Sequence, residues 1–158
     1  MTIEGILRKL FPRRQALGPS ITVDPEIDPK WLEDLLDKEF PYLSDCEWLF
    51  RSVYHSVLGS LQAWIREFKE KNGITHIREE RDVRRAWFDT PKIVETIEGH
   101  VSALIYVSRG VRLRLAYYSH RIGALPFSER IAKTVASSYT TYLVEYTNTR
   151  LFTGQQKP

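Results

Sequence analysis

Residues 44–73 read SDCEWLFRSVYHSVLGSLQAWIREFKEKNG, and this stretch predicts the element around which the fold is built. Its large apolar side chains recur every three or four residues, which is the spacing of one helix face. Ser44 and Glu47 have the spacing of a capping box, and Gly73 follows the last turn as a C-cap signal. We therefore expect one helix of about seven turns over 44–71, in the centre of the core.

The clearest strand signal is a predicted hairpin over 100–119, with its turn at Ser108-Arg109-Gly110. After the turn, apolar and polar side chains alternate, which predicts a strand with one buried face and one face in solvent. The expected buried face holds Val111, Leu113, Leu115 and Tyr117, and the opposite face holds Arg112 and Arg114.

Other stretches complete the predicted secondary structure. Asp28 and Pro29 begin a short helix, and a last helix is expected from about Ser128 to Tyr146. The sequence after Tyr146 fits a continued helix or a strand, and Pro91–Gly99 is equally ambiguous. The fold class expected is α+β: a single compact domain with a long central helix, a small antiparallel sheet and a C-terminal helix.

The first fourteen residues, MTIEGILRKLFPRR, predict a mobile, basic amphipathic arm. Its apolar side chains share one helix face, its basic side chains lie beside that face, and an anionic membrane offers a partner to both. The alternative is a helix that docks onto its own domain. The predicted membrane-binding residues are Ile3, Ile6, Leu7, Arg8, Lys9, Leu10, Phe11, Arg13 and Arg14.

The expected organisation is a basic arm over 1–14, a proline-containing linker over 15–29, a globular α+β domain over 30–152 and a tail over 153–158. The 158 residues carry a net charge of +3 and one cysteine, so no internal disulfide forms within the chain. No apolar run is long enough to span a bilayer, and the arm does not resemble a secretory signal. We therefore expect a cytoplasmic protein that is peripheral on the inner face of a membrane.

The sequence lacks the common motifs of phosphate-binding, serine-nucleophile and zinc-dependent enzymes. It has no glycine-rich phosphate loop, no GxSxG and no HExxH, and its four histidines lack a second ligand type at metal spacing. Cys46 has no nearby histidine and is expected to be a plain buried cysteine. We expect no catalytic residue, no metal, no cofactor and no small-molecule substrate, so the protein is predicted not to be an enzyme.

With no signature of catalysis, we expect the protein to act by binding. The residues that favour binding are the arginines of the predicted hairpin. With Tyr106 and Tyr118 beside them, they have the composition of a surface that contacts phosphates with some help from stacking. The alternatives are a solvated sheet face, or a face covered by acidic side chains from elsewhere. The residues predicted to bind a nucleocapsid or nucleic acid are Arg109, Arg112, Arg114 and Arg121.

The order of these parts resembles that of the matrix proteins of rhabdoviruses. The likeness rests on ILRKLFPRR at 6–14, LGP at 17–19, SRGVRLRL at 108–115 and FSER at 127–130. It implies an α+β domain and a viral structural protein of the virion that bridges the nucleocapsid to the inner membrane leaflet and self-associates. The chain lacks the Pro-Pro-x-Tyr budding motif of many members, which leaves budding by that route without support. The competing prediction is an RNA-binding viral accessory or regulatory protein, in which both basic regions serve RNA.

Overall fold

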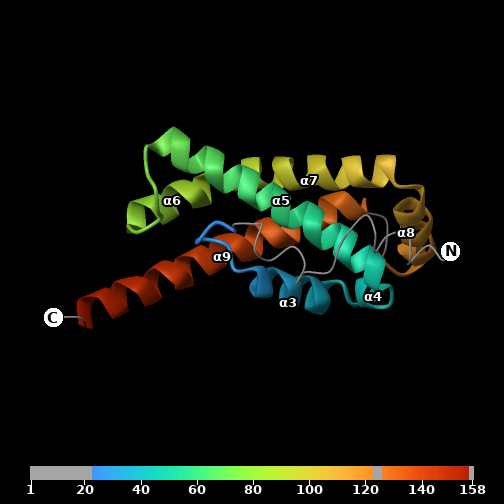
Figure 1. The fold of residues 1–158 in the computed structure, drawn as a ribbon, viewed down its shortest axis with the longest axis horizontal. Coiled ribbons are helices and arrows are strands. Elements are labelled where there is room, and N and C mark those ends of the chain that lie inside the picture. The colour runs from blue at the N-terminus through green and yellow to red at the C-terminus, as the bar shows by residue number, and fades with distance from the viewer. Residues whose placement is uncertain (1–22, 123–125, 157–158) are drawn as a thin grey trace.

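The computed structural model describes residues 23–122 and 126–156, and these residues form an elongated assembly of helices (Figure 1). The predicted α+β class is wrong, because this part of the chain contains no strand. Its helices are α3 (Pro29–Glu39), α4 (Pro41–Ser44), α5 (Glu47–Asn72), α6 (Glu80–Phe88), α7 (Thr90–Val107), α8 (Arg109–Ile122) and α9 (Phe127–Gln156).

Three long helices form the body of the molecule. Helix α7 packs against both α5 and α9, while α3 and α4 cover the first half of α5 (Figure 1). Helix α6 lies toward one end of the long axis, and α8 lies at the other end. None of the helices in the described residues is both long enough and apolar enough to cross a bilayer.

The central helix begins and ends close to its predicted limits. Helix α5 starts one residue after Cys46, and the Ser44 hydroxyl bonds the Asp37 carboxylate rather than capping α5. Its end is the predicted one, since Gly73 has φ 64°, a left-handed conformation that glycine adopts without steric cost. The predicted start of α3 is also confirmed, because the Asp28 side chain accepts a hydrogen bond from the backbone N–H of Lys30 at 3.0 Å.

The region of the predicted hairpin, 100–119, forms the end of α7 and most of α8. The backbone turns at Ser108, whose φ of −107° and ψ of 102° are extended, so the predicted turn marks a real break in the chain. The Ser108 hydroxyl accepts a hydrogen bond from the N–H of Val111 at 3.2 Å, which is the pattern of a helix N-cap. The break therefore joins α7 to α8 instead of joining two strands.

Residues 91–99 are part of α7, which resolves their ambiguity in favour of a helix. Ile93, Ile97 and Val101 recur every four residues along α7 and are fully buried. Apolar and polar residues do not alternate in this stretch, and its apolar residues have helical spacing. The apolar face that results packs against α5 and α9. The backbone after Tyr146 likewise continues as helix α9.

A buried polar cluster fastens residues 23–28 to the core. The ammonium group of Lys69 on α5 bonds the Asp24 carboxylate at 2.7 Å and also the fully buried carboxylate of Glu26. The same carboxylate accepts the N–H of Ile77 at 3.0 Å, and the Tyr139 hydroxyl donates to the backbone carbonyl of Glu26 at 2.9 Å. This Glu26 cluster therefore ties the segment that precedes α3 to both α5 and α9.

Candidate functional site

Helix α8 buries only one narrow stripe of its surface. Val111, Leu115 and Tyr118 recur at the helical spacing and are at most 7% exposed. The ring of Tyr118 lies 5.3 Å from that of Tyr42, measured between centroids, and Gly110 lies against the indole of Trp48. The other side chains of α8 from Arg109 to Ser119 are exposed.

The outward face of α8 is apolar at its centre. Leu113 and Tyr117, one turn apart, are 61% and 64% exposed, although the predicted strand placed both in the core. Tyr106 and Val107, at the end of α7, are more exposed still. Together with the arginines of α8 these residues form a surface that we call the basic end: Tyr106, Val107, Arg109, Arg112, Leu113, Arg114 and Tyr117.

The arginines of the basic end surround its apolar centre. At about 100° per residue, Arg112 and Arg114 lie roughly 200° apart on the helix, on opposite flanks of Leu113. The prediction that they share one face is therefore wrong. The Arg112 guanidinium also lies near the end of α7, where it donates to the carbonyl of Tyr106 at 3.5 Å.

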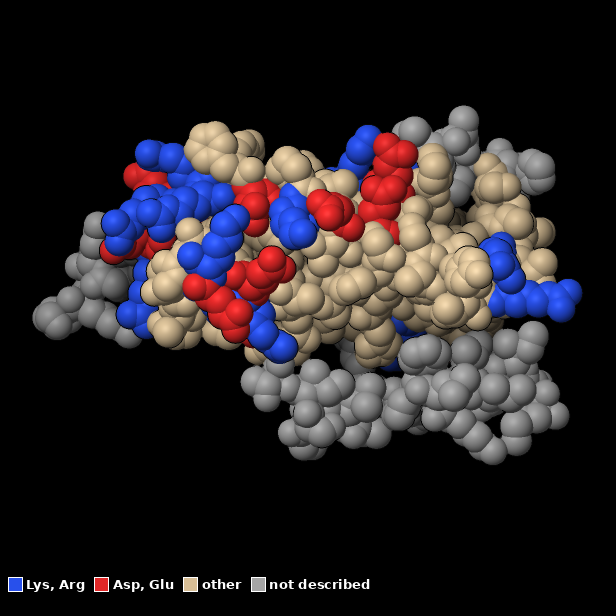
Figure 2. Space-filling view, turned by 90° about the horizontal axis from the view of Figure 1, so that it is seen from above, with Lys and Arg blue, Asp and Glu red and all other residues tan. Residues whose placement is uncertain are grey.

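The positive charge of the basic end is not neutralised by its neighbours in the chain. Residues 99–128 contain no aspartate or glutamate, and residues 93–132 contain no lysine. Within the described residues, Arg109, Arg112 and Arg114 are exposed and form no ion pair. Figure 2 shows basic side chains without acidic neighbours at the end where α8 lies, whereas basic and acidic side chains mix at the α6 end.

Two arginines at the α6 end form exposed ion pairs. Arg84 pairs with Glu80 at 3.3 Å, and Arg81 pairs with Glu79 at 2.8 Å. These ion pairs lie on or directly before the short helix α6. An exposed basic residue at this end is therefore a suitable control for one at the basic end.

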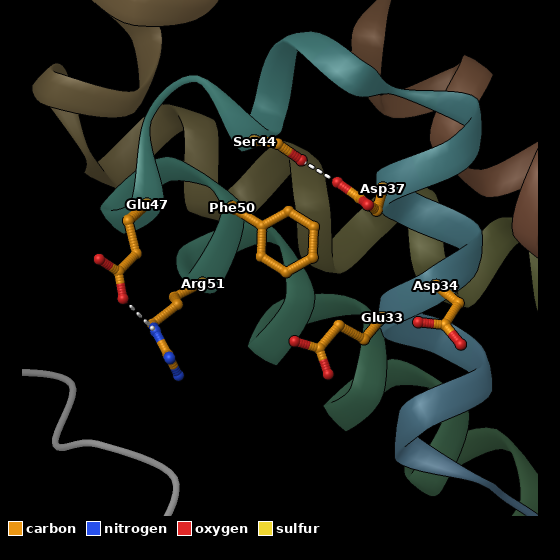
Figure 3. Close-up of a pocket in the computed structure, with 7 residues that line it drawn as sticks. All are labelled: Glu33, Asp34, Asp37, Ser44, Glu47, Phe50 and Arg51. Carbon is orange, nitrogen blue, oxygen red and sulfur yellow. Dashed lines mark hydrogen bonds and ion pairs between the residues drawn. The ribbon is translucent and has the colours of Figure 1, made fainter.

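A pocket of about 330 Å³ opens between α3 and the first turns of α5 (Figure 3). Figure 3 shows the Phe50 ring between the acidic side chains of α3 and the Glu47–Arg51 pair, whose Oε1 and Nε atoms are 3.3 Å apart. Four carboxylates and one guanidinium give the pocket a net charge of −3 if all are ionised. We call this the acidic pocket; its lining residues are Glu33, Asp34, Asp37, Ser44, Glu47, Phe50 and Arg51.

Sequence reasoning missed the acidic pocket. On α3, Glu33 and Asp37 are four residues apart and therefore share one side of the helix. That spacing is a signal present in the sequence. The approach of α3 to Glu47 and Phe50 has no such signal, because it depends on how α4 turns the chain back onto α5.

The remaining predicted site residues are placed only in part. The predicted membrane-binding residues, from Ile3 to Arg14, lie outside the described residues. The backbone of Arg121 belongs to α8, and its side chain lies outside the described part. The structure therefore brings together Arg109, Arg112 and Arg114 of the predicted set.

One serine–histidine pair was not foreseen. The Ser60 hydroxyl lies 2.7 Å from Nδ1 of His100, which links α5 to α7. Ser60 is fully buried and its hydroxyl also bonds the carbonyl of Ser56 at 2.7 Å, so this pair serves helix packing. The described residues contain no cluster of three histidine, cysteine, aspartate or glutamate side chains suited to a metal ion.

The basic end and the acidic pocket are two exposed surfaces of the helical bundle that are suited to binding. The basic end offers guanidinium groups around an apolar centre, and the acidic pocket offers carboxylates around an aromatic ring. Comparison of the chain with protein-family models, with curated proteins and with solved structures finds no match.

Proposed function

We propose that this protein is a non-enzymatic structural protein of the viral matrix type, which acts by binding and not by catalysis. One observation carries the proposal: the basic end presents exposed Leu113 and Tyr117 among three arginines that have no ion pair in the described residues. Exposed apolar side chains that are grouped in this way mark a contact surface for a partner. The arginines specify that the partner is anionic.

In this proposal the two basic regions have different tasks. The arm over residues 1–14 binds the anionic inner face of a membrane, so the protein is peripheral in the cytoplasm and enters the virion. The basic end binds the nucleocapsid or a neighbouring subunit. The proposal keeps the function implied by the rhabdovirus resemblance, while its α+β fold and the hairpin at 108–115 are set aside because that stretch is helical.

The test compares membrane and RNA binding of the full chain. We expect R8Q/K9Q/R13Q/R14Q to reduce flotation with vesicles that contain phosphatidylserine, and R112E/R114E to leave this flotation largely unchanged. R112E/R114E is expected to weaken binding to the nucleocapsid or to another subunit. R81E/R84E is the matched control, because it reverses two exposed arginines at the α6 end.

The competing function is an RNA-binding viral accessory protein, which the exposed Tyr106 and Tyr117 beside arginines favour. It predicts that both the arm variant and R112E/R114E lose RNA binding, each with a shallower dependence on salt concentration. Loss of RNA binding by both variants, together with unchanged vesicle flotation, would reject the matrix-type function.

A further inference from the structure

We infer that the basic end of one copy of this protein docks onto the acidic pocket of a second copy. This inference rests on the proposed matrix-type function and names the partner of the same site. The surface concerned is the outward face of α8, which has no covering element within the described residues. The occupant that we assign to it is another molecule of this chain.

The composition of the basic end favours a protein partner. Its charges come from arginine, with no lysine between residues 93 and 132, and its exposed apolar groups include two tyrosines, a leucine and a valine. Arginine and aromatic residues are enriched in protein interfaces, whereas lysine is depleted. Leu113 and Val107 offer nucleic acid neither stacking nor a charge.

The two surfaces are complementary in charge. The basic end carries three positive charges, and the acidic pocket carries a net of three negative charges when its side chains are ionised. A guanidinium group makes paired hydrogen bonds to a carboxylate, so Arg112 and Arg114 suit acceptors such as Asp34 and Asp37. Asp34 and Asp37 are both exposed, so contact between copies would bring the arginines of the basic end next to these carboxylates.

Each of the two surfaces also contains apolar side chains. On α8, Leu113 is exposed to solvent and has an arginine on each side. The acidic pocket has the partly buried Phe50 in its wall. Pockets of about 300 to 1,000 Å³ accommodate drug-sized groups, so 330 Å³ admits one large side chain with part of its neighbours.

A contact between two different surfaces is heterologous, and it repeats from copy to copy until it closes a ring or extends a chain. Each molecule then uses its basic end once and its acidic pocket once. This arrangement provides the self-association that a matrix layer needs.

The experiment measures the mass of the full-length protein by analytical ultracentrifugation over a range of protein and salt concentrations. We expect the wild type to self-associate at low salt, and R112E/R114E and D34R/D37R each to weaken association by more than about tenfold. Mixing the two variants is expected to restore association, because the basic end of D34R/D37R can bind the unchanged acidic pocket of R112E/R114E. Thermal melting of each variant checks that it is folded, and R81E/R84E should associate as the wild type does.

A second experiment combines all four changes in one chain. With both surfaces reversed, R112E/R114E/D34R/D37R is expected to self-associate again. A wild type that stays monomeric at every concentration would overturn the inference, and so would a mixture of the two double variants that forms no heterodimer.

The failure of this inference and that of the proposed function are distinguishable. If R112E/R114E associates normally but loses binding to nucleocapsids, the basic end serves that partner, and only the inference falls. If it associates normally but loses binding to phosphatidylserine vesicles, the basic end serves the membrane and the inference also falls. If it keeps association, vesicle binding and nucleocapsid binding, both the inference and the proposed role of the basic end are wrong.

Discussion

The ammonium group of Lys69 donates a hydrogen bond to the carboxylate of Glu26, which lies 43 residues earlier in the chain. Glu26 is fully buried and Lys69 is nearly so. Two charges removed from water in this way stabilise a fold only while they remain paired. The Glu26 cluster therefore makes the stability of the domain depend on residues that precede its first described helix.

Replacement of Lys69 by methionine is expected to lower the free energy of unfolding by about 3–5 kcal/mol, because the Glu26 carboxylate remains buried without its cation. The measurement is urea denaturation followed by circular dichroism. Lys71→Met is the matched control, since Lys71 is exposed in the same turn of α5 and its loss should change stability by less than about 0.5 kcal/mol. Equal effects of the two changes would contradict the buried pair.

The contribution of Asp24 to stability should depend on pH. Burial alone raises the pKa of Asp24, but hydrogen bonds with Glu26 and Lys69 outweigh it and lower the pKa below the ordinary value. A lowered pKa in the folded state stabilises the protein above the unfolded pKa, about 3.9, and this stabilisation is lost as the pH falls through the folded value. Asp24→Asn should therefore be less stable than the wild type at neutral pH, and the difference should shrink below about pH 4. Urea denaturation of both proteins from pH 7 to pH 3 measures it, and a gap of constant size would argue against the Asp24 interaction.

Substitutions of two leucines in α8 distinguish the helix from the predicted strand. Leu115 is 7% exposed, so Leu115→Asp places a charge in the core and should cost about 3 kcal/mol or more. Leu113→Asp should change stability by less than about 0.5 kcal/mol, because Leu113 faces solvent. Thermal melts of the two variants decide the matter. Comparable destabilisation by both would restore the strand, in which the two residues share a face.

Asp89 lies between α6 and α7 and is hydrogen-bonded to the buried indole of Trp64. The Trp64 Nε1 group donates to Oδ2 of Asp89 at 3.0 Å. Asp89→Ala leaves this donor buried without an acceptor and should cost about 1–3 kcal/mol, whereas Asp89→Asn keeps an acceptor and should cost less. Chemical denaturation followed by tryptophan fluorescence measures both variants. An alanine variant as stable as the asparagine variant would show that the hydrogen bond contributes little.

The hairpin prediction failed because the sequence over 111–118 contains two periods at once. Alternate residues place Val111, Leu113 and Leu115 on one strand face, while Val111, Leu115 and Tyr118 have the spacing of one helix face. In a segment this short, neither period excludes the other. The packing of Tyr118 against Tyr42, and of Gly110 against Trp48, selects the helix.

The sequence by itself determined the elements whose signals are local. The long central helix, its end at Gly73 and the start of α3 at Asp28 follow from apolar spacing, glycine conformation and side-chain capping, all of which act within a few residues. The concentration of arginine without acidic neighbours in residues 99–128 is likewise a property of the sequence alone.

Only the tertiary structure decided which side chains of α8 face solvent and what lies opposite the carboxylates of α3. The exposure of Leu113 depends on which stripe of α8 packs against the bundle, and the acidic pocket depends on the approach of α5 to α3. Both are set by burial of apolar surface between segments distant in the chain, and this driving force is non-directional and proportional to area. A local pattern therefore names the residues of a contact surface, and long-range packing determines where they point.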